Sequence, residues 1–272
     1  MDKAAHTRVT HPASRLATLD VGRIGARKHH VAAFVEVNVT GALAGIRELR
    51  REGVPVSFFA WVVRVVGLTL DDHPWVHALR SGKRSTVQLE GVDISVAVER
   101  KVAGARVPLP LVIRCAHEKS VSAIHAEIRA ARTRPIPSEG DPVLSRGGPS
   151  ALAMRVYYAL PQWLRLTAMR RILNNPLRCR AQMGTAMITS VGSVARVPGW
   201  ILPKSLHNVC VALGSVVRKP WVVGEAIVAQ DILPVTVLFA HDIVDGAPAA
   251  RFLADLVGRL EAGSGLSPTP VA

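Results

Sequence analysis

The sequence predicts an α/β fold, a two-layer sandwich in which a mixed β-sheet is flanked by helices. Apolar residues alternate with other residues in 31–39 and in 92–98, as in half-buried strands. In 247–260 the apolar residues recur instead at the three- and four-residue spacing of an amphipathic helix. Strand patterns dominate the C-terminal half, and in the N-terminal half helical patterns lie between the strand patterns. This order indicates one sheet with helices packed on it.

The N-terminal half supplies the first predicted elements. Residues 1–20 are polar and mixed, and we interpret them as an arm whose order depends on a neighbour. A basic cluster, Arg27 to His30, precedes the strand in 31–39. A helix is predicted from Thr40 to a stop at Gly53, and a largely buried helix in the apolar stretch 56–76. Strands in 91–100 and 107–114 and a helix in 119–132 follow.

An insertion is predicted at about 134–183. Its first part, 134–150, is rich in proline, glycine and serine and reads as a loop. Its second part reads as a basic amphipathic helix, because Trp163 and other apolar residues are interleaved with Arg165, Arg170 and Arg171. Such a helix either contacts an anionic membrane through 150–173, roofs a binding channel, or packs on the protein's own core.

The C-terminal half reads mainly as strands. They are predicted from Gly184 onward, in 208–217 and 221–223, and in 233–240, with a tight turn at Gly224 and Glu225. A helix covers 247–260, and the tail 263–272 is predicted to be flexible. The spacing demands only one domain, and 272 residues can bury one substantial core.

Composition limits the partners and the compartment. The formal net charge is +14, which favours anionic partners such as nucleic acid, anionic lipid or phosphorylated cofactors, or reflects a solvated basic surface. Aromatic residues make up only 4%, and no nucleic-acid motif is present, so we expect no nucleic-acid partner. Three scattered cysteines suggest neither a disulfide framework nor a metal site, and they favour the reducing cytoplasm. No apolar run approaches the ~18 residues of a membrane span.

His241 is the strongest candidate for a catalytic group. It ends an apolar strand pattern and begins H-D-I-V-D-G, so it lies where a strand gives way to a turn. Gly246 suits the turn, and Asp245 can cap the following helix or pair with a cation. The competing interpretation is a partly buried histidine that hydrogen-bonds its own backbone and performs no chemistry.

The residues around His241 resemble a family signature. A-H-D-I-V-D-G-A-P-A-A-R-F-L is similar to the D-H-R-x-x-D-G-A-x-A-A-R-F-L signature of the catalytic domain of 2-oxo acid dehydrogenase acyltransferases, and more distantly to H-H-x-x-x-D-G of chloramphenicol acetyltransferase. Ala240 and Asp242 depart from it, and the usual residue at the second position is arginine. Residues 109–114 and 119–120 also resemble the family, so the likeness covers most of the chain and implies a chloramphenicol acetyltransferase-like fold.

The resemblance also implies the roles of other residues. G-T-A-M-I-T-S-V-G resembles the strand that carries the family's catalytic hydroxyl, which places Thr189 at that position. Ser190 would face the opposite side of the strand, so we expect it only to modulate the site. Asp242, which replaces the usual arginine, is likewise expected to be a modulator. A similar basic stretch in chloramphenicol acetyltransferase implies that Arg27 pairs with Asp245.

The family resemblance implies a coenzyme A-dependent acyltransferase. Acyl-coenzyme A would be the co-substrate, His241 the general base, Thr189 the oxyanion donor and no metal would be needed. The family's histidine and hydroxyl come from neighbouring subunits, which implies a homotrimer with its sites at the interfaces. The acceptor, a thiol or a hydroxyl, is not identified.

Two alternatives to this function remain. The first is a non-catalytic scaffold or membrane-docking protein with the same fold. The second is the acyltransferase component of a 2-oxo acid dehydrogenase complex, acting with lipoyl domains in trans. The sequence contains no lipoyl or subunit-binding domain pattern, so we expect a free-standing trimer.

Overall fold

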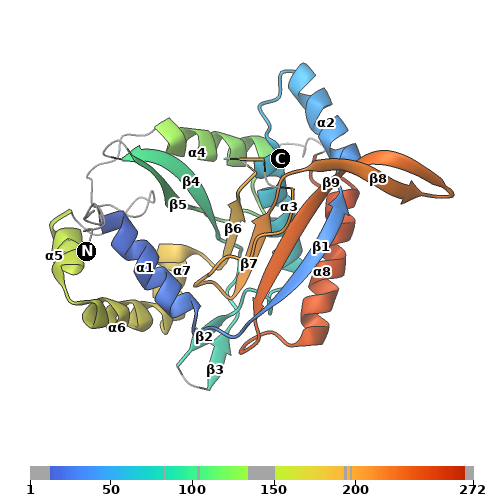
Figure 1. Ribbon diagram of the computed structural model, residues 1–272. Helices are drawn as coiled ribbons and strands as arrows, with labels where there is room; N and C mark the ends of the chain where they lie inside the picture. Colours follow the sequence, from blue (N-terminus) through green and yellow to red (C-terminus); the bar gives the residue numbers. More distant parts are fainter. Residues whose placement is uncertain are drawn as a thin grey trace, which may run out of the picture.

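A mixed β-sheet forms the centre of the molecule (Figure 1). The computed structural model describes residues 13–82, 84–102, 105–133, 151–192, 195–196 and 198–266. The strand order is β1-β9-β7-β6-β4-β5, with β8 paired to β9 and a separate pair, β2-β3. The β4·β6 and β6·β7 pairs are parallel and the other pairs are antiparallel, so the predicted mixed sheet is confirmed.

Except for β2 and β3, which the sequence did not predict, the strands overlap the stretches predicted as strands. They are β1 (His30–Asn38), β2 (Leu79–Ser81), β3 (Ser85–Val87), β4 (Ile94–Val102), β5 (Ala105–Ile113), β6 (Ala186–Ser190), β7 (Val209–Leu213), β8 (Val217–Val223) and β9 (Ala226–Ala240). The last strand is longer than predicted because its first part, residues 226–232, pairs with β8. The predicted turn joins them, with Gly224 at a positive φ of 61°.

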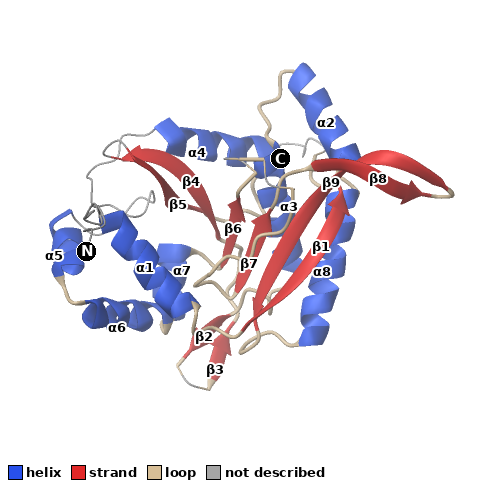
Figure 2. Ribbon diagram, in the orientation of Figure 1, coloured by secondary structure: helices blue, strands red, loops and turns tan. Residues whose placement is uncertain are grey.

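The helices fall into two groups (Figure 2). The first group is α2 (Thr40–Arg51), α3 (Phe58–Asp72), α4 (Val121–Thr133) and α8 (Gly246–Glu261). The second is α1 (Ala13–Gly25), α5 (Ala151–Ala159), α6 (Gln162–Leu173) and α7 (Pro176–Met183). None of the described helices is long and apolar enough to cross a membrane.

The first group of helices packs on one face of the sheet and encloses the core. Alternate residues of β9, among them Val235, Val237 and Phe239, join the α3 residue Trp61 and the α8 residue Phe252 in one buried cluster. Residues 232–240 of β9 are all buried, but only alternate ones join this cluster, because successive side chains of a strand point to opposite faces. The helix face and the opposite face of each strand can therefore be assigned from the register.

The second group of helices forms an appendage beside the sheet, at the left of Figure 1. Two predictions about it were wrong. Part of the expected N-terminal arm is the helix α1, and the expected basic amphipathic helix is three short helices, α5 to α7. Residues 134–150, the predicted loop of the insertion, lie outside the described residues.

A buried ion pair holds α1 to α6. The Arg165 Nε atom lies 2.7 Å from Asp20 Oδ2, and Gln162 Nε2 donates to Asp20 Oδ1 at 3.0 Å. Both ionic side chains are buried, so Arg165 does not belong to a solvated basic face as the sequence suggested. Breaking such a pair leaves an uncompensated buried charge, which makes α1 and α6 depend on each other.

The beginning of the predicted flexible tail is folded against the body. Leu266 packs on the core cluster, and the Trp61 Nε1 atom donates to the carbonyl of Ser264 at 2.8 Å. The prediction was therefore wrong for residues 263–266, while 267–272 lie outside the described residues.

Candidate active site

His241 begins the turn between β9 and α8. Its side chain is exposed, and its backbone N–H donates to the carbonyl of His29 at 2.8 Å, just beyond the β1·β9 pair. Within the described residues its ring forms no hydrogen bond, unlike the satisfied structural histidine of the competing interpretation. The imidazole is thus held by the backbone of two strands while both ring nitrogens stay available for proton transfer.

Asp242 pairs with a neighbouring strand rather than with His241. Its Oδ1 atom accepts from His29 Nδ1 at 2.8 Å, and this hydrogen bond lowers the pKa of Asp242. The departure from the family arginine therefore creates a contact with the basic cluster before β1. Among the described residues, Asp242 forms its hydrogen bond with His29 and none with the His241 ring.

Thr189 lies in β6, on the face opposite the core helices. Ile188 belongs to the buried cluster, so by alternation Ser190 shares its side and Thr189 points the other way. The flanking glycines are sterically required. A Cβ on Gly184, whose φ is 76°, would lie 2.6 Å from the Asp93 carbonyl, and one on Gly192 would lie 2.9 Å from that of Gly214.

The register separates Thr189 from His241 within one chain. Thr189 is level with Ala212 on β7, which is level with Thr236 on β9. His241 lies five residues further along β9. At about 3.3 Å per residue and about 4.8 Å between strands, the two backbone positions are roughly 19 Å apart. One chain alone does not bring the base and the hydroxyl together.

The remaining predicted residues, Asp245, Gly246 and Arg27, form no side-chain hydrogen bond or ion pair with His241 in the described part of the chain. Asp245 occupies the N-cap position of α8, yet its side chain makes no capping hydrogen bond. Arg27 and Asp245 are both exposed and, in the part of the chain that the structure describes, form no ion pair with each other. A Cβ on Gly246 would meet nothing within 4 Å, so the turn does not demand glycine there.

A half-buried lysine lies beneath this end of the sheet. Lys28 Nζ donates to Asn208 Oδ1 at 2.7 Å, and Asn208 Nδ2 donates to the Ala78 carbonyl at 2.7 Å. Burial lowers the pKa of Lys28 to about 8. The carbonyl of Asn208 also accepts from the Ala240 N–H at 2.7 Å, so this network supports the residue before His241. The sequence flagged the basic cluster but could not show that Lys28 points inward.

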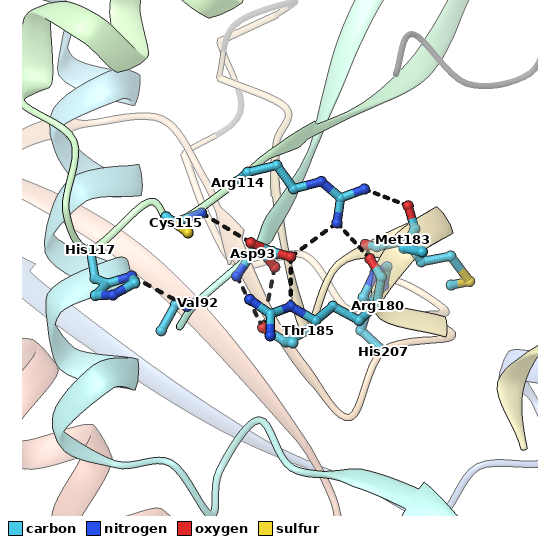
Figure 3. Close-up of polar contacts among 10 residues, drawn as sticks. Val92, Asp93, Arg114, Cys115, His117, Arg180, Met183, Thr185 and His207 are labelled. Carbon is cyan, nitrogen blue, oxygen red and sulfur yellow. Dashed lines mark hydrogen bonds and ion pairs between the residues drawn. The ribbon is translucent and has the colours of Figure 1, made fainter. Parts of the chain in front are cut away.

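A second polar network ties the appendage to the sheet (Figure 3). Asp93 Oδ2 lies 2.9 Å from Arg114 Nη1 and 2.8 Å from Arg180 Nε, while Asp93 Oδ1 accepts from the Cys115 N–H. Burial alone would raise the pKa of Asp93, but the hydrogen bonds from Arg180, Cys115 and Arg114 lower it. Sequence reasoning missed Asp93, although a carboxylate between apolar strand residues was a usable signal.

The sequence match to known proteins agrees with this architecture. Residues 26–135 and 180–266, well over half of the chain, match the model of the family described as 2-oxoacid dehydrogenases acyltransferase (catalytic domain). The chain belongs to this family. The two matched ranges of this acyltransferase-family chain contain all of the candidate site residues, whereas α1, α5 and α6 lie outside the match.

One curated relative covers nearly all of this family member. The dihydrolipoyllysine-residue acetyltransferase component of the pyruvate dehydrogenase complex from Zymomonas mobilis subsp. mobilis is 23% identical over 263 residues. The match covers 92% of this chain and 50% of that protein, so the chain spans about half the length of the relative.

Solved structures show the same fold. A probable dihydrolipoamide acetyltransferase from Listeria monocytogenes superimposes with a TM-score of 0.68 at 20% identity, covering 99% of both chains. A dihydrolipoamide acetyltransferase of Azotobacter vinelandii, studied for the roles of a serine, a histidine and an asparagine in its catalytic mechanism, superimposes with a TM-score of 0.69. Its identity is 16%, with 96% of this chain and 94% of that chain covered. The two-layer acyltransferase fold is therefore confirmed.

Proposed function

We propose that this chain transfers an acyl group between coenzyme A and a dihydrolipoyl thiol, with His241 as general base and Thr189 as oxyanion donor. The observation that carries the proposal is the exposed imidazole of His241, held at the end of β9 inside the family motif. The relative from Zymomonas mobilis is named for a dihydrolipoyllysine residue, which favours a thiol acceptor over the hydroxyl alternative.

The spacing of the catalytic residues named for the Azotobacter vinelandii enzyme supports this assignment. In that protein the asparagine follows the histidine by four positions, as Asp245 follows His241. Its serine precedes the histidine by the same interval by which Thr189 precedes His241. A hydroxyl, an imidazole and a short polar side chain thus recur at matching positions.

The reaction follows from two side chains. His241 takes the proton of the attacking thiol, and the sulfur adds to the thioester carbonyl. Negative charge develops on the carbonyl oxygen, to which the Thr189 hydroxyl donates a hydrogen bond. The tetrahedral intermediate collapses by breaking the original carbon–sulfur bond, and the imidazolium returns its proton to the departing thiolate. No acyl-enzyme is needed.

The two side chains would meet across a subunit interface. They are roughly 19 Å apart along the sheet of one chain, so a second copy must supply one of them. A ring of three copies with one site at each interface satisfies this requirement with closed symmetry. The apolar β8–β9 arm, which projects from the body at the right of Figure 1, is a candidate for the contact between copies.

The non-catalytic alternative has less support. It was motivated by Asp242 in place of arginine, and the Asp242 carboxylate hydrogen-bonds His29 instead of the His241 ring. We therefore retain the catalytic proposal.

The test is a thiol-release assay with acyl-coenzyme A and free dihydrolipoamide. We expect His241→Ala to abolish turnover and Thr189→Ala to lower kcat by about 10²–10³-fold, because one oxyanion donor is lost. Thr189→Ser keeps the hydroxyl and should retain most activity. Ser190→Ala is the matched control, since that side chain faces the core helices. Full activity in His241→Ala, with the assembly verified by ultracentrifugation, would refute the mechanism.

A further inference from the structure

One side of α6 is exposed and carries an aromatic residue beside two cations. Trp163, Thr167 and Arg170 are spaced i, i+4 and i+7, which places them on one face of the helix. All three are exposed, as is Arg171, and the Trp163 side chain is 67% exposed. The opposite side of α6 holds the buried Arg165, so the orientation of the helix is determined by the Asp20 ion pair.

The exposed face continues onto the first turn of α7. Leu177 is 71% exposed and Arg178 is exposed beside it, directly after the short turn that joins the two helices. We call the set of Trp163, Arg170, Arg171, Leu177 and Arg178 the appendage surface.

The charge of the appendage surface is unbalanced. Residues 151–183 contain no aspartate or glutamate, whereas six arginines lie among them. Two of these form ion pairs, Arg165 with Asp20 and Arg180 with Asp93, and Asp93 is shared with Arg114. The guanidinium groups of Arg170, Arg171 and Arg178 form no ion pair with any residue that the structure describes. Guanidinium groups bind carboxylates through paired, charge-assisted hydrogen bonds, so this surface is complementary to an acidic partner.

The appendage surface is joined to the end of the sheet where His241 lies. The helix α7 ends at Met183, whose carbonyl accepts from His207 Nε2 at 2.8 Å. The carbonyl of His207 in turn accepts from His30 Nε2 at 3.0 Å, at the start of β1 and opposite Ala240. A partner bound to α6 and α7 would therefore lie on the same end of the sheet as the proposed base.

We infer that the appendage surface docks an acidic carrier domain that presents the acyl-accepting thiol to the site. This inference rests on the proposed function and names the partner that would deliver its thiol. An aromatic anchor with arginines around it is the composition of an interface hot spot. The family model does not match α1, α5 and α6, so most of this docking surface lies in the part of the chain that the model leaves out.

A protein partner fits better than a membrane. Membrane binding through 150–173 required one continuous amphipathic helix with a free apolar face. The structure has three short helices instead, and the inward side of α6 is occupied by the Asp20–Arg165 pair. Among the described residues of 151–183, the exposed large apolar side chains are Leu152, Val156, Trp163 and Leu177. The last two lie beside the arginines of the appendage surface, which suits specific anchoring on a folded domain.

The experiment compares two forms of the thiol on the assembled protein. The carrier probe is a recombinant lipoyl domain with an excess of aspartate and glutamate, and the small probe is free dihydrolipoamide. The variants are Trp163→Ala and the double variant Arg170→Glu/Arg171→Glu. The control, Arg129→Glu/Arg132→Glu on the exposed side of α4, changes the net charge by the same amount.

We expect both appendage variants to raise the KM for the carrier probe about tenfold or more, with the KM for free dihydrolipoamide unchanged. An unchanged carrier KM, or an equal effect of the α4 control, would overturn the docking inference. Binding to anionic phospholipid vesicles that the variants lose, with the carrier KM unaltered, would assign the surface to a membrane and also overturn it.

Failure of the proposed function gives a different result. In that case wild type transfers no acyl group even to free dihydrolipoamide. The docking inference is then decided by calorimetric titration of the same lipoyl domain. Binding that weakens about tenfold in the appendage variants supports it, and no binding to wild type refutes it.

Discussion

Two buried histidines show how burial lowers the pKa of a single side chain. His207 donates through Nε2 to the Met183 carbonyl, while its Nδ1 is buried without a partner. Burial lowers the pKa of His207 to about 4, and burial also lowers the pKa of His77 to about 4. These rings therefore stay neutral well below the pH at which a free imidazole takes up a proton.

The low pKa of His207 predicts acid sensitivity. As the pH falls from about 6.5 to 4, His207 becomes protonated in the unfolded state but stays neutral in the folded state. The free energy of unfolding therefore decreases. The decrease is about 3 kcal/mol for one fully buried histidine. We expect urea unfolding at fixed protein concentration to show a smaller decrease for His207→Gln than for wild type. The control is His241→Gln, because the His241 ring is exposed and forms no hydrogen bond with any residue that the structure describes. Equal decreases in wild type and His207→Gln would contradict the prediction.

The β8–β9 arm exposes apolar side chains that need to be covered by another surface. Val222 is paired with Ile227 and Trp221 with Val228, so apolar side chains lie on both faces of the ribbon. Ile227 is 74% exposed and Val222 67%. A two-stranded ribbon is marginal on its own and exposes these side chains unless another surface covers them.

Charged substitutions in the arm should dissociate the assembly. We expect Val222→Asp/Ile227→Asp to shift the protein from trimer to monomer, because the carboxylates would be buried in an apolar contact. Activity should fall with it, since the proposed site needs two copies. Analytical ultracentrifugation measures the mass, and Leu152→Asp, at the 72% exposed Leu152 of α5, is the control. A trimer in the arm variant would exclude the arm from the interface.

The charge of the whole molecule bears on its encounter with substrate. Lysines and arginines number 34 against 20 acidic residues, so the surface attracts anions over a distance set by ionic strength. Coenzyme A carries phosphates, whereas dihydrolipoamide is uncharged. The two substrates of the proposed reaction should respond differently to salt.

Salt should weaken the binding of coenzyme A selectively. We expect its KM to rise several-fold between about 0.05 and 0.5 M sodium chloride, as screening removes the long-range attraction. The KM for free dihydrolipoamide, measured in the same reactions, should stay nearly constant. A parallel rise of both constants would point to a general effect of salt on the protein instead.

The amino-acid sequence predicted most of the central sheet and the helices of the core, and it supplied the candidate site residues. Alternating apolar residues predicted β1 and β4, and the residues around His241 and Thr189 carried the family resemblance. These properties are local, because they depend on spacing along the chain. Gly184 and Gly192 matched the ends of the family strand motif, and the structure shows that a Cβ at either position would meet backbone atoms.

The contacts between residues that are distant in sequence became known only from the folded structure. Asp20 with Arg165, Asp93 with Arg180, and Asp242 with His29 lie far apart in sequence, and no periodicity relates their positions. The same is true of the interval between Thr189 and His241, which follows from strand order and register. A buried charge needs a partner, but burial and partner arise only when the elements pack, so the inward positions of Arg165 and Lys28 could not be predicted.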